Sequence, residues 1–182
     1  SVDIQRRGVS GSELGNDPVI ERGDVLHCDF GITVMRLNTD TQYMAYVLRD
    51  GETDAPEGLK VALANAQRLQ DILLEKTEVG MTGNEVLYEV LSQMRAEGLN
   101  GTMYSHPIGE HGHGSGPLIG LWDYQEGVPG RGDVPVLNGM WFSTELQVTT
   151  PVAEWGGQPV RMALEEEAEV TPTGERRWSL RR

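Results

Sequence analysis

The sequence has few of the features that place a protein in a class at once. Its 182 residues include one cysteine, Cys28, so no internal disulfide forms, and the choice between a cytoplasmic and a periplasmic location stays open. No run of apolar residues approaches 18, so we expect no membrane-spanning helix. Basic residues are also scarce. The 15 Lys and Arg stand against 28 Asp and Glu, and the net charge of −13 argues against nucleic acid or an anionic membrane as a partner.

The length suits one domain, residues 1–182, that is long enough to bury a core. The 23 glycines predict prominent loops and turns. The chain begins at Ser1 without an initiator Met, so we expect it to be the C-terminal part of a longer protein.

Hydrophobic periodicity predicts two groups of strands separated by two amphipathic helices. Residues 1–24 are polar and Gly-rich and predict a loop, with no helix before the first strand. A capping box at Asp54 and Glu57 begins a helix that ends near Lys76, and a second box at Thr82 and Glu85 begins one that ends at Glu97. The expected strands cover residues 25–35, 42–48, 141–148 and 160–170, with a short last strand after a turn at 173–175. This order predicts an α+β fold with a mostly antiparallel sheet.

Two aspartates lie in or beside the first predicted hairpin. Asp29 is a single carboxylate inside the apolar strand His27-Cys28-Asp29-Phe30-Gly31, where it is unfavourable unless it is paired or bound to a cation. Asp40 follows eleven positions later, and a hairpin would bring both side chains onto one face. For Asp40 alone, beside Asn38 and Thr39, a turn that faces water is the favoured interpretation.

Three of the four histidines, His106, His111 and His113, fall within eight residues of a Gly-rich stretch. Such clustering favours metal binding or acid–base chemistry over separate core histidines. Two later glutamates, Glu145 in a strand-like run and Glu165 at the start of Glu165-Glu166-Glu167, are by themselves compatible with solvated side chains.

Taken in order, these residues resemble the site of the pita-bread metallopeptidases, which include methionine aminopeptidases, Xaa-Pro aminopeptidases and prolidases. The resemblance extends from about Gly23 to Thr171. It implies a pita-bread fold, in which helices cover a curved sheet, and a catalytic metallopeptidase domain. It also implies that two divalent ions are bound by five ligands, which are Asp29, Asp40, His106, Glu145 and Glu165. Manganese is the expected metal, and cobalt, zinc and iron also suit such ligands.

The resemblance also assigns roles to the other histidines. His113 competes with His106 as the metal ligand, because Gly112-His113-Gly114 also looks like a ligand motif of the family. Family members carry a catalytic histidine seven positions after the ligand, and this spacing selects His106 as ligand and His113 as the catalytic group. We therefore assign His113 and Glu145 to catalysis, and His111 and His113 to substrate binding.

The chain departs from the family at its N-terminal end. Ser12 stands where members usually have a substrate-contacting histidine, and the upstream helical segment is lacking. We therefore expect that the N-terminal part of the domain is missing and that an apolar sheet face is covered by a docked N-terminal segment or by the second copy of a homodimer.

The implied function is hydrolysis of an Xaa-Pro bond in a peptide or dipeptide, because the long loop 114–139 resembles that branch. The alternatives are an aminopeptidase of the methionine type, a metal-free binding module on the same fold, and metal-free hydrolysis of a small guanidino compound. Arg131-Gly132-Asp133 matches an adhesion signal, but a turn is the simpler interpretation.

Overall fold

The structure is a computed structural model that describes residues 1–109, 115–179 and 181. Its helices are α1 (Gly11–Leu14), α2 (Glu57–Lys76) and α3 (Gly83–Ala96), with short 3-10 turns η1 (Arg131–Asp133) and η2 (Ala153–Trp155). Its strands are β1 (Val2–Gln5), β2 (Val25–Phe30), β3 (Thr33–Val34), β4 (Leu37–Asn38), β5 (Thr41–Tyr46), β6 (Gly101–Met103), β7 (Met140–Ser143), β8 (Leu146–Val152), β9 (Gln158–Leu164), β10 (Glu167–Val170) and β11 (Arg176–Trp178).

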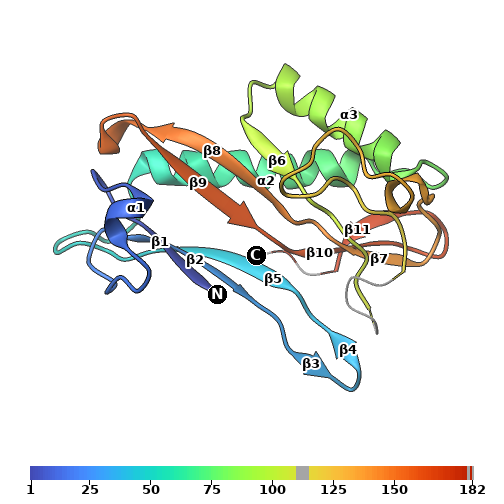
Figure 1. The fold of residues 1–182 in the computed structure, drawn as a ribbon, viewed down its shortest axis with the longest axis horizontal. Coiled ribbons are helices and arrows are strands. Elements are labelled where there is room, and N and C mark those ends of the chain that lie inside the picture. Colours follow the sequence, from blue (N-terminus) through green and yellow to red (C-terminus); the bar gives the residue numbers. More distant parts are fainter. Residues whose placement is uncertain (110–114, 180, 182) are drawn as a thin grey trace.

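The strands of the described residues form three three-stranded sheets, β1-β2-β5, β6-β8-β9 and β11-β10-β7, and the ribbon β3-β4. Every pair within them is antiparallel. A bridge between Gln42 and Glu165 joins the first sheet to the segment between β9 and β10, so the sheets follow one another as a curved layer (Figure 1). The structure thus has the predicted α+β architecture with an antiparallel sheet.

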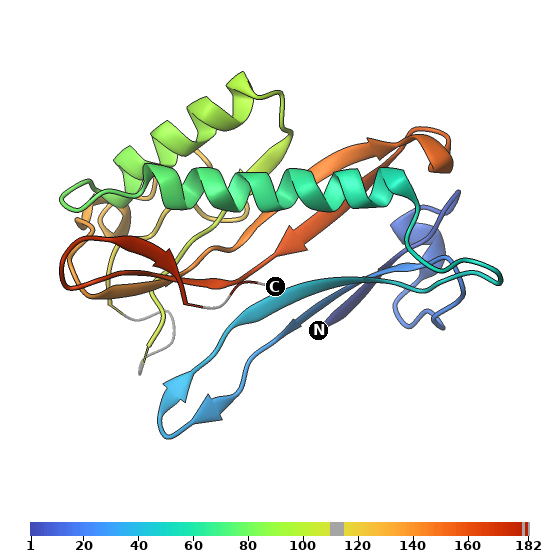
Figure 2. The ribbon, with the colours of Figure 1, turned by 180° about the vertical axis from the view of Figure 1, so that it is seen from behind.

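Helix α2 covers the sheet β6-β8-β9, and α3 lies beside it on the same side (Figure 2). The apolar positions of α2 recur every three or four residues, as an amphipathic helix requires. Its buried side chains include Leu69, Ile72 and Leu73, all 0% exposed, and they pack in one core with Val148 and Met162 of the sheet. A leucine buried to this extent contributes about 1.5–3 kcal/mol relative to an exposed one.

Only one of the two predicted capping boxes forms. Thr82 accepts a hydrogen bond from the Glu85 backbone N–H, and the Glu85 carboxylate reaches back to the Thr82 backbone N–H. The prediction at Asp54 is wrong, because α2 begins after Pro56, and Asp54 instead accepts a hydrogen bond from Ala55 and pairs with Lys60. Since the residue before a proline avoids the helical region, the chain stays extended at this point.

The prediction that residues 1–24 form a loop with no helix is also wrong. Strand β1 pairs with β2 along its whole length, from Val2 opposite Cys28 to Gln5 opposite Val25, and the short helix α1 follows. The Arg6 guanidinium then donates two hydrogen bonds of 2.8 Å to the buried carboxylate of Asp24 and so ties this segment to the start of β2.

The tip of the hairpin that contains β3 and β4 projects from the rest of the molecule (Figure 1). Large apolar side chains are exposed along it, namely Phe30, Ile32, Val34, Met35 and Leu37. These exposed side chains are one apolar surface that another chain or segment could cover. That a docked N-terminal segment or the second copy of a homodimer covers an apolar sheet face stays a prediction. None of the described helices combines the length and the apolar character needed to cross a membrane.

Candidate metal centre

Two of the predicted strands are each divided in two, and a glutamate lies at each division. Glu145 lies between β7 and β8, and Glu165 lies between β9 and β10. The divisions face each other, because Thr144 donates both its backbone N–H and its hydroxyl to the carbonyl oxygen of Glu166, at 2.8 and 2.7 Å. The predicted continuous strands 141–148 and 160–170 are therefore wrong at these points. Where a strand is interrupted, its side chains leave the regular alternation, and each carboxylate is free to turn inward.

The hairpin formed by β2 and β5 carries both aspartates. Asp29 lies directly opposite Gln42, and Asp40 lies just before β5, two residues before Gln42. The predicted strand 25–35 ends earlier than expected, at Phe30, and resumes as the short β3. Asp40 does not face water freely, because its side chain is 25% exposed and its Oδ2 lies 3.9 Å from His106 Nε2.

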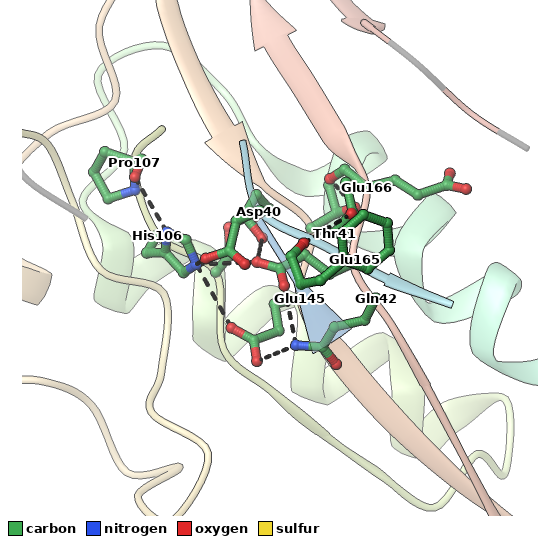
Figure 3. A network of polar contacts seen from close by, with 12 residues as sticks. Asp40, Thr41, Gln42, His106, Pro107, Glu145, Glu165 and Glu166 are labelled. Atoms are coloured by element: carbon green, nitrogen blue, oxygen red, sulfur yellow. Dashed lines mark hydrogen bonds and ion pairs between the residues drawn. The ribbon is translucent and has the colours of Figure 1, made fainter. Parts of the chain in front are cut away.

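His106 lies in the loop that follows β6 and is 0% exposed. Its Nδ1 donates to the carbonyl oxygen of Pro107 at 3.1 Å, which directs Nε2 towards the acidic side chains (Figure 3). Nε2 lies 3.1 Å from Glu165 Oε1 and 3.6 Å from Glu145 Oε2. The ligand atoms of Asp40, His106 and Glu165 all lie within 4.8 Å of one another, a separation that suits one shared cation.

The charges of the site favour a cation. Burial by itself would lower the pKa of His106, but hydrogen bonds to Glu145 and Glu165 outweigh it and raise that pKa to about 10. Burial also raises the pKa of the nearby Tyr104 hydroxyl, and the charge of Glu145 adds to this effect. Several carboxylates so close together repel one another, and a divalent ion among them would remove this repulsion.

Other side chains donate hydrogen bonds to the carboxylates, and this role was not predicted from the sequence. Ser143 donates its hydroxyl to Glu165 Oε1, which is already near His106. Gln42, 5% exposed, donates from Nε2 to Glu145 Oε1 at 2.7 Å and to Glu165 Oε2 at 3.0 Å. The only indication of this role was that Gln42 lies opposite Asp29 and two residues after Asp40. A solvated glutamine could occupy the same position.

A cavity of about 250 Å³ adjoins the cluster. Asp29 and Glu145 lie on its wall, together with Tyr104, Trp122 and Arg161. Asp29 thus shares the cavity with Glu145, and neither belongs to the group of Asp40, His106 and Glu165 whose ligand atoms lie within 4.8 Å of one another. The cavity presents two aromatic side chains and a guanidinium as well as acids.

Two predicted histidines and the Arg131-Gly132-Asp133 motif remain to be located. His111 and His113 lie outside the described residues. Arg131, Gly132 and Asp133 form the 3-10 turn η1, in which Gly132 is buried and Asp133 accepts a hydrogen bond from Asn84 at 2.8 Å. This agrees with the interpretation of these three residues as a turn.

Comparison with known proteins gives a family and a fold. Residues 7–172 match metallopeptidase family M24. No curated protein sequence matches the chain. Among solved structures, an X-Pro aminopeptidase from Thermotoga maritima superposes with a TM-score of 0.64 at 21% identity, over 92% of this chain and 43% of that chain. A prolidase from Pyrococcus furiosus gives a TM-score of 0.64 at 19% identity, over 93% and 45%.

A methionine aminopeptidase from Rickettsia prowazekii is similar to the same extent, with a TM-score of 0.61 at 21% identity, over 88% of this chain and 66% of that chain. The chain thus spans less than half the length of the X-Pro aminopeptidase and the prolidase. These likenesses confirm the predicted pita-bread fold.

Proposed function

Because the chain belongs to metallopeptidase family M24, we propose that residues 1–182 form the catalytic domain of a peptidase that uses two divalent metal ions. One observation carries this proposal: Asp40, Glu145 and Glu165, which come from three separate segments, converge on the Nε2 edge of the buried His106. An imidazole buried among carboxylates disfavours the alternative of a metal-free binding module.

The proposed ligands are Asp29, Asp40, His106, Glu145 and Glu165. One imidazole and four carboxylates suit manganese, which we propose as the natural metal, and they also suit cobalt, zinc or iron(II). When bound, the ions supply Lewis acidity towards the scissile carbonyl and lower the pKa of a water molecule towards neutrality. The Pro107 carbonyl keeps the proton of His106 on Nδ1, so Nε2 is the atom available to a cation.

We assign proton transfer, metal binding and substrate binding to different side chains of the site. Glu145, 22% exposed and on the cavity wall, is placed to accept a proton from the attacking water and to pass it to the leaving amine. Glu165, 1% exposed and held by Ser143, is in contrast shielded from the cavity and serves to bind metal. We assign to His113 the hydrogen bond to the substrate where negative charge develops, and to His111 a further part in substrate binding.

We further propose that the substrate is an Xaa-Pro peptide or dipeptide, cleaved to release its N-terminal residue. The similarity to an X-Pro aminopeptidase and a prolidase supports this specificity. The similarity to a methionine aminopeptidase supports the methionine type as a second candidate.

Metal content and substrate choice together test the proposal. The intact protein, purified without chelator, should hold about two equivalents of metal and should cleave Ala-Pro in preference to Met-Ala-Ser when supplied with Mn²⁺. Glu165→Gln should lower the metal content, whereas Glu169→Gln should not, because Glu169 on β10 pairs with Arg177 on β11. Preference for Met-Ala-Ser would select the methionine type. Protein without metal and without peptidase activity would support the binding module.

A further inference from the structure

One buried amide contacts two of the proposed metal ligands. Nε2 of Gln42 lies 2.7 Å from Glu145 Oε1 and 3.0 Å from Glu165 Oε2 (Figure 3). A carboxylate accepts hydrogen bonds and an amide nitrogen carries two hydrogens, so each hydrogen goes to a different glutamate. Both hydrogens of the amide are therefore used within the site, and the orientation of the amide is fixed.

The second oxygen of each glutamate is turned towards the imidazole. Glu165 Oε1 lies 3.1 Å and Glu145 Oε2 lies 3.6 Å from His106 Nε2. Gln42 thus holds one oxygen of each carboxylate and leaves the other oxygen on the side where a cation would bind. Without this shared donor, the two carboxylates can rotate away from each other to relieve the repulsion between their charges.

The amide is itself held from behind. Its Oε1 accepts a hydrogen bond from His27 Nε2 at 2.9 Å, and His27 Nδ1 lies 3.1 Å from Asp3 Oδ2. His27 is 6% exposed and lies opposite Asp3 in the pairing of β1 with β2. A continuous set of contacts therefore runs from Asp3 through His27 and Gln42 to the glutamates.

We propose that Gln42 is a positioning residue for the metal site, and that His27 acts through it by fixing the orientation of its amide. The inference rests on the proposed function, because it assigns the two glutamates to metal binding. Residues that hold metal ligands from behind typically change metal affinity or activity by about 10- to 100-fold when they are lost. We expect a change of this size for Gln42 and a smaller one for His27, which is one contact further away.

The test compares two glutamines in the intact protein. Gln42→Leu should weaken Mn²⁺ binding, measured by titration calorimetry, by about 10- to 100-fold, and should alter the absorption spectrum of bound Co²⁺. Gln5→Leu is the matched control, because the Gln5 amide also bridges two strands, contacting the backbone of Arg161 at 2.7 and 2.8 Å, but touches no proposed ligand. It should lower the melting temperature and leave the Mn²⁺ affinity and the Co²⁺ spectrum unchanged.

A double-mutant cycle tests the role of His27. His27→Phe should weaken Mn²⁺ binding in the wild-type background and should have no further effect in the Gln42→Leu background, because its contact to the site is then already lost. If Gln42→Leu does not fold, Gln42→Met, which keeps the length of the side chain without a donor, takes its place. If neither folds, His27→Phe alone decides the question by its Mn²⁺ affinity.

Different outcomes would refute the role of Gln42 and the proposed metal-dependent function. Equal Mn²⁺ affinity in the wild type and the folded Gln42 variant, or unchanged affinity on the His27 change alone, would overturn the inference. Wild-type protein that binds no divalent metal would refute the proposed function and the inference with it.

Discussion

Glu145 and Glu165 lie at two strand interruptions that face each other, and one amide donates a hydrogen bond to both carboxylates. The interruptions bring acidic side chains from two antiparallel segments to the same histidine. The local irregularity of the sheet is thus the structural basis of the proposed site.

The first prediction concerns the two half-buried acids on the cavity wall. Asp29→Ala and Glu145→Ala should each reduce metal-dependent peptidase activity by more than about 100-fold, because removing a ligand exceeds the effect of removing its support. The measurement is peptide hydrolysis by the intact protein at saturating metal. Asp50→Ala, at an aspartate whose side chain is 89% exposed and pairs with Arg22, is the control and should retain full activity. Near-normal turnover of either ligand variant would refute the five-ligand assignment.

The second prediction separates the roles of two histidines. His106→Ala should weaken metal binding by at least about 100-fold, because Nε2 of His106 is the imidazole atom that the described residues bring to the cluster. His113→Ala should leave metal binding intact and mainly lower kcat, with a loss of about 10²- to 10³-fold, typical of a lost transition-state hydrogen bond. Equilibrium dialysis and steady-state kinetics measure the two effects. Loss of metal from the His113 variant alone would mean that the two roles are exchanged.

The third prediction uses the ion pair that ties the N-terminal segment to β2. Asp24→Asn should reduce the free energy of unfolding by about 2 kcal/mol at neutral pH, because the buried carboxylate accepts charged hydrogen bonds from Arg6. Arg22→Ala, which removes an exposed pair with Asp50, should have no measurable effect. Urea denaturation measures both.

The same variant predicts a pH dependence. The hydrogen bond from Arg6 holds the pKa of Asp24 below its usual value of 3.8, although burial opposes this. A lowered folded-state pKa gives stability that is complete above the unfolded value and is lost as pH falls through the folded value. The difference between wild type and Asp24→Asn should therefore be constant from pH 7 to about 4 and shrink at lower pH. A difference that shrinks already between pH 7 and 5 would contradict the assignment.

The fourth prediction compares the capping box that forms with the one that does not. Thr82→Ala should destabilise the protein by about 1 kcal/mol, because the N-cap of α3 loses its acceptor. Asp54→Ala should cause no measurable loss, because Asp54 lies outside α2 and its contacts, with the Ala55 backbone N–H and with Lys60, are exposed. Thermal unfolding of the two variants distinguishes them. Equal losses would mean that Asp54 caps α2 in solution.

Sequence reasoning was most successful where a pattern is local or chemically unusual. The periodicity of apolar residues predicted α2 and α3 because a helix buries one face along its whole length. An aspartate in an apolar strand and three histidines within eight residues of the sequence are rare enough to indicate a site on their own. The family resemblance then supplied the two glutamates, which no local pattern distinguished from solvated acids.

The failures have equally specific causes. Strand β1 was missed because its partner β2 lies 20 to 26 residues later, and the four-residue alternation of apolar and polar side chains in Val2–Gln5 is too short to reveal such pairing. The interruptions at Glu145 and Glu165 were missed because apolar residues lie on both sides of each, and the short polar runs 143–145 and 165–167 do not show whether a strand continues through them. Gln42 and His27 were missed because their contacts cross three strands, and a polar side chain alone does not indicate what lies opposite.

The proposed site joins parts of the chain that are far apart in the sequence, as with His106 and Glu165, which are separated by 59 residues. An unfolded chain therefore holds no preformed site, and a cation that binds these residues binds the native state almost exclusively. By mass action, metal at 100 times its dissociation constant would add about 2.7 kcal/mol to the stability of the fold. Metal supply would then control how long the protein survives in the cell as well as its activity, since degradation draws on the unfolded population.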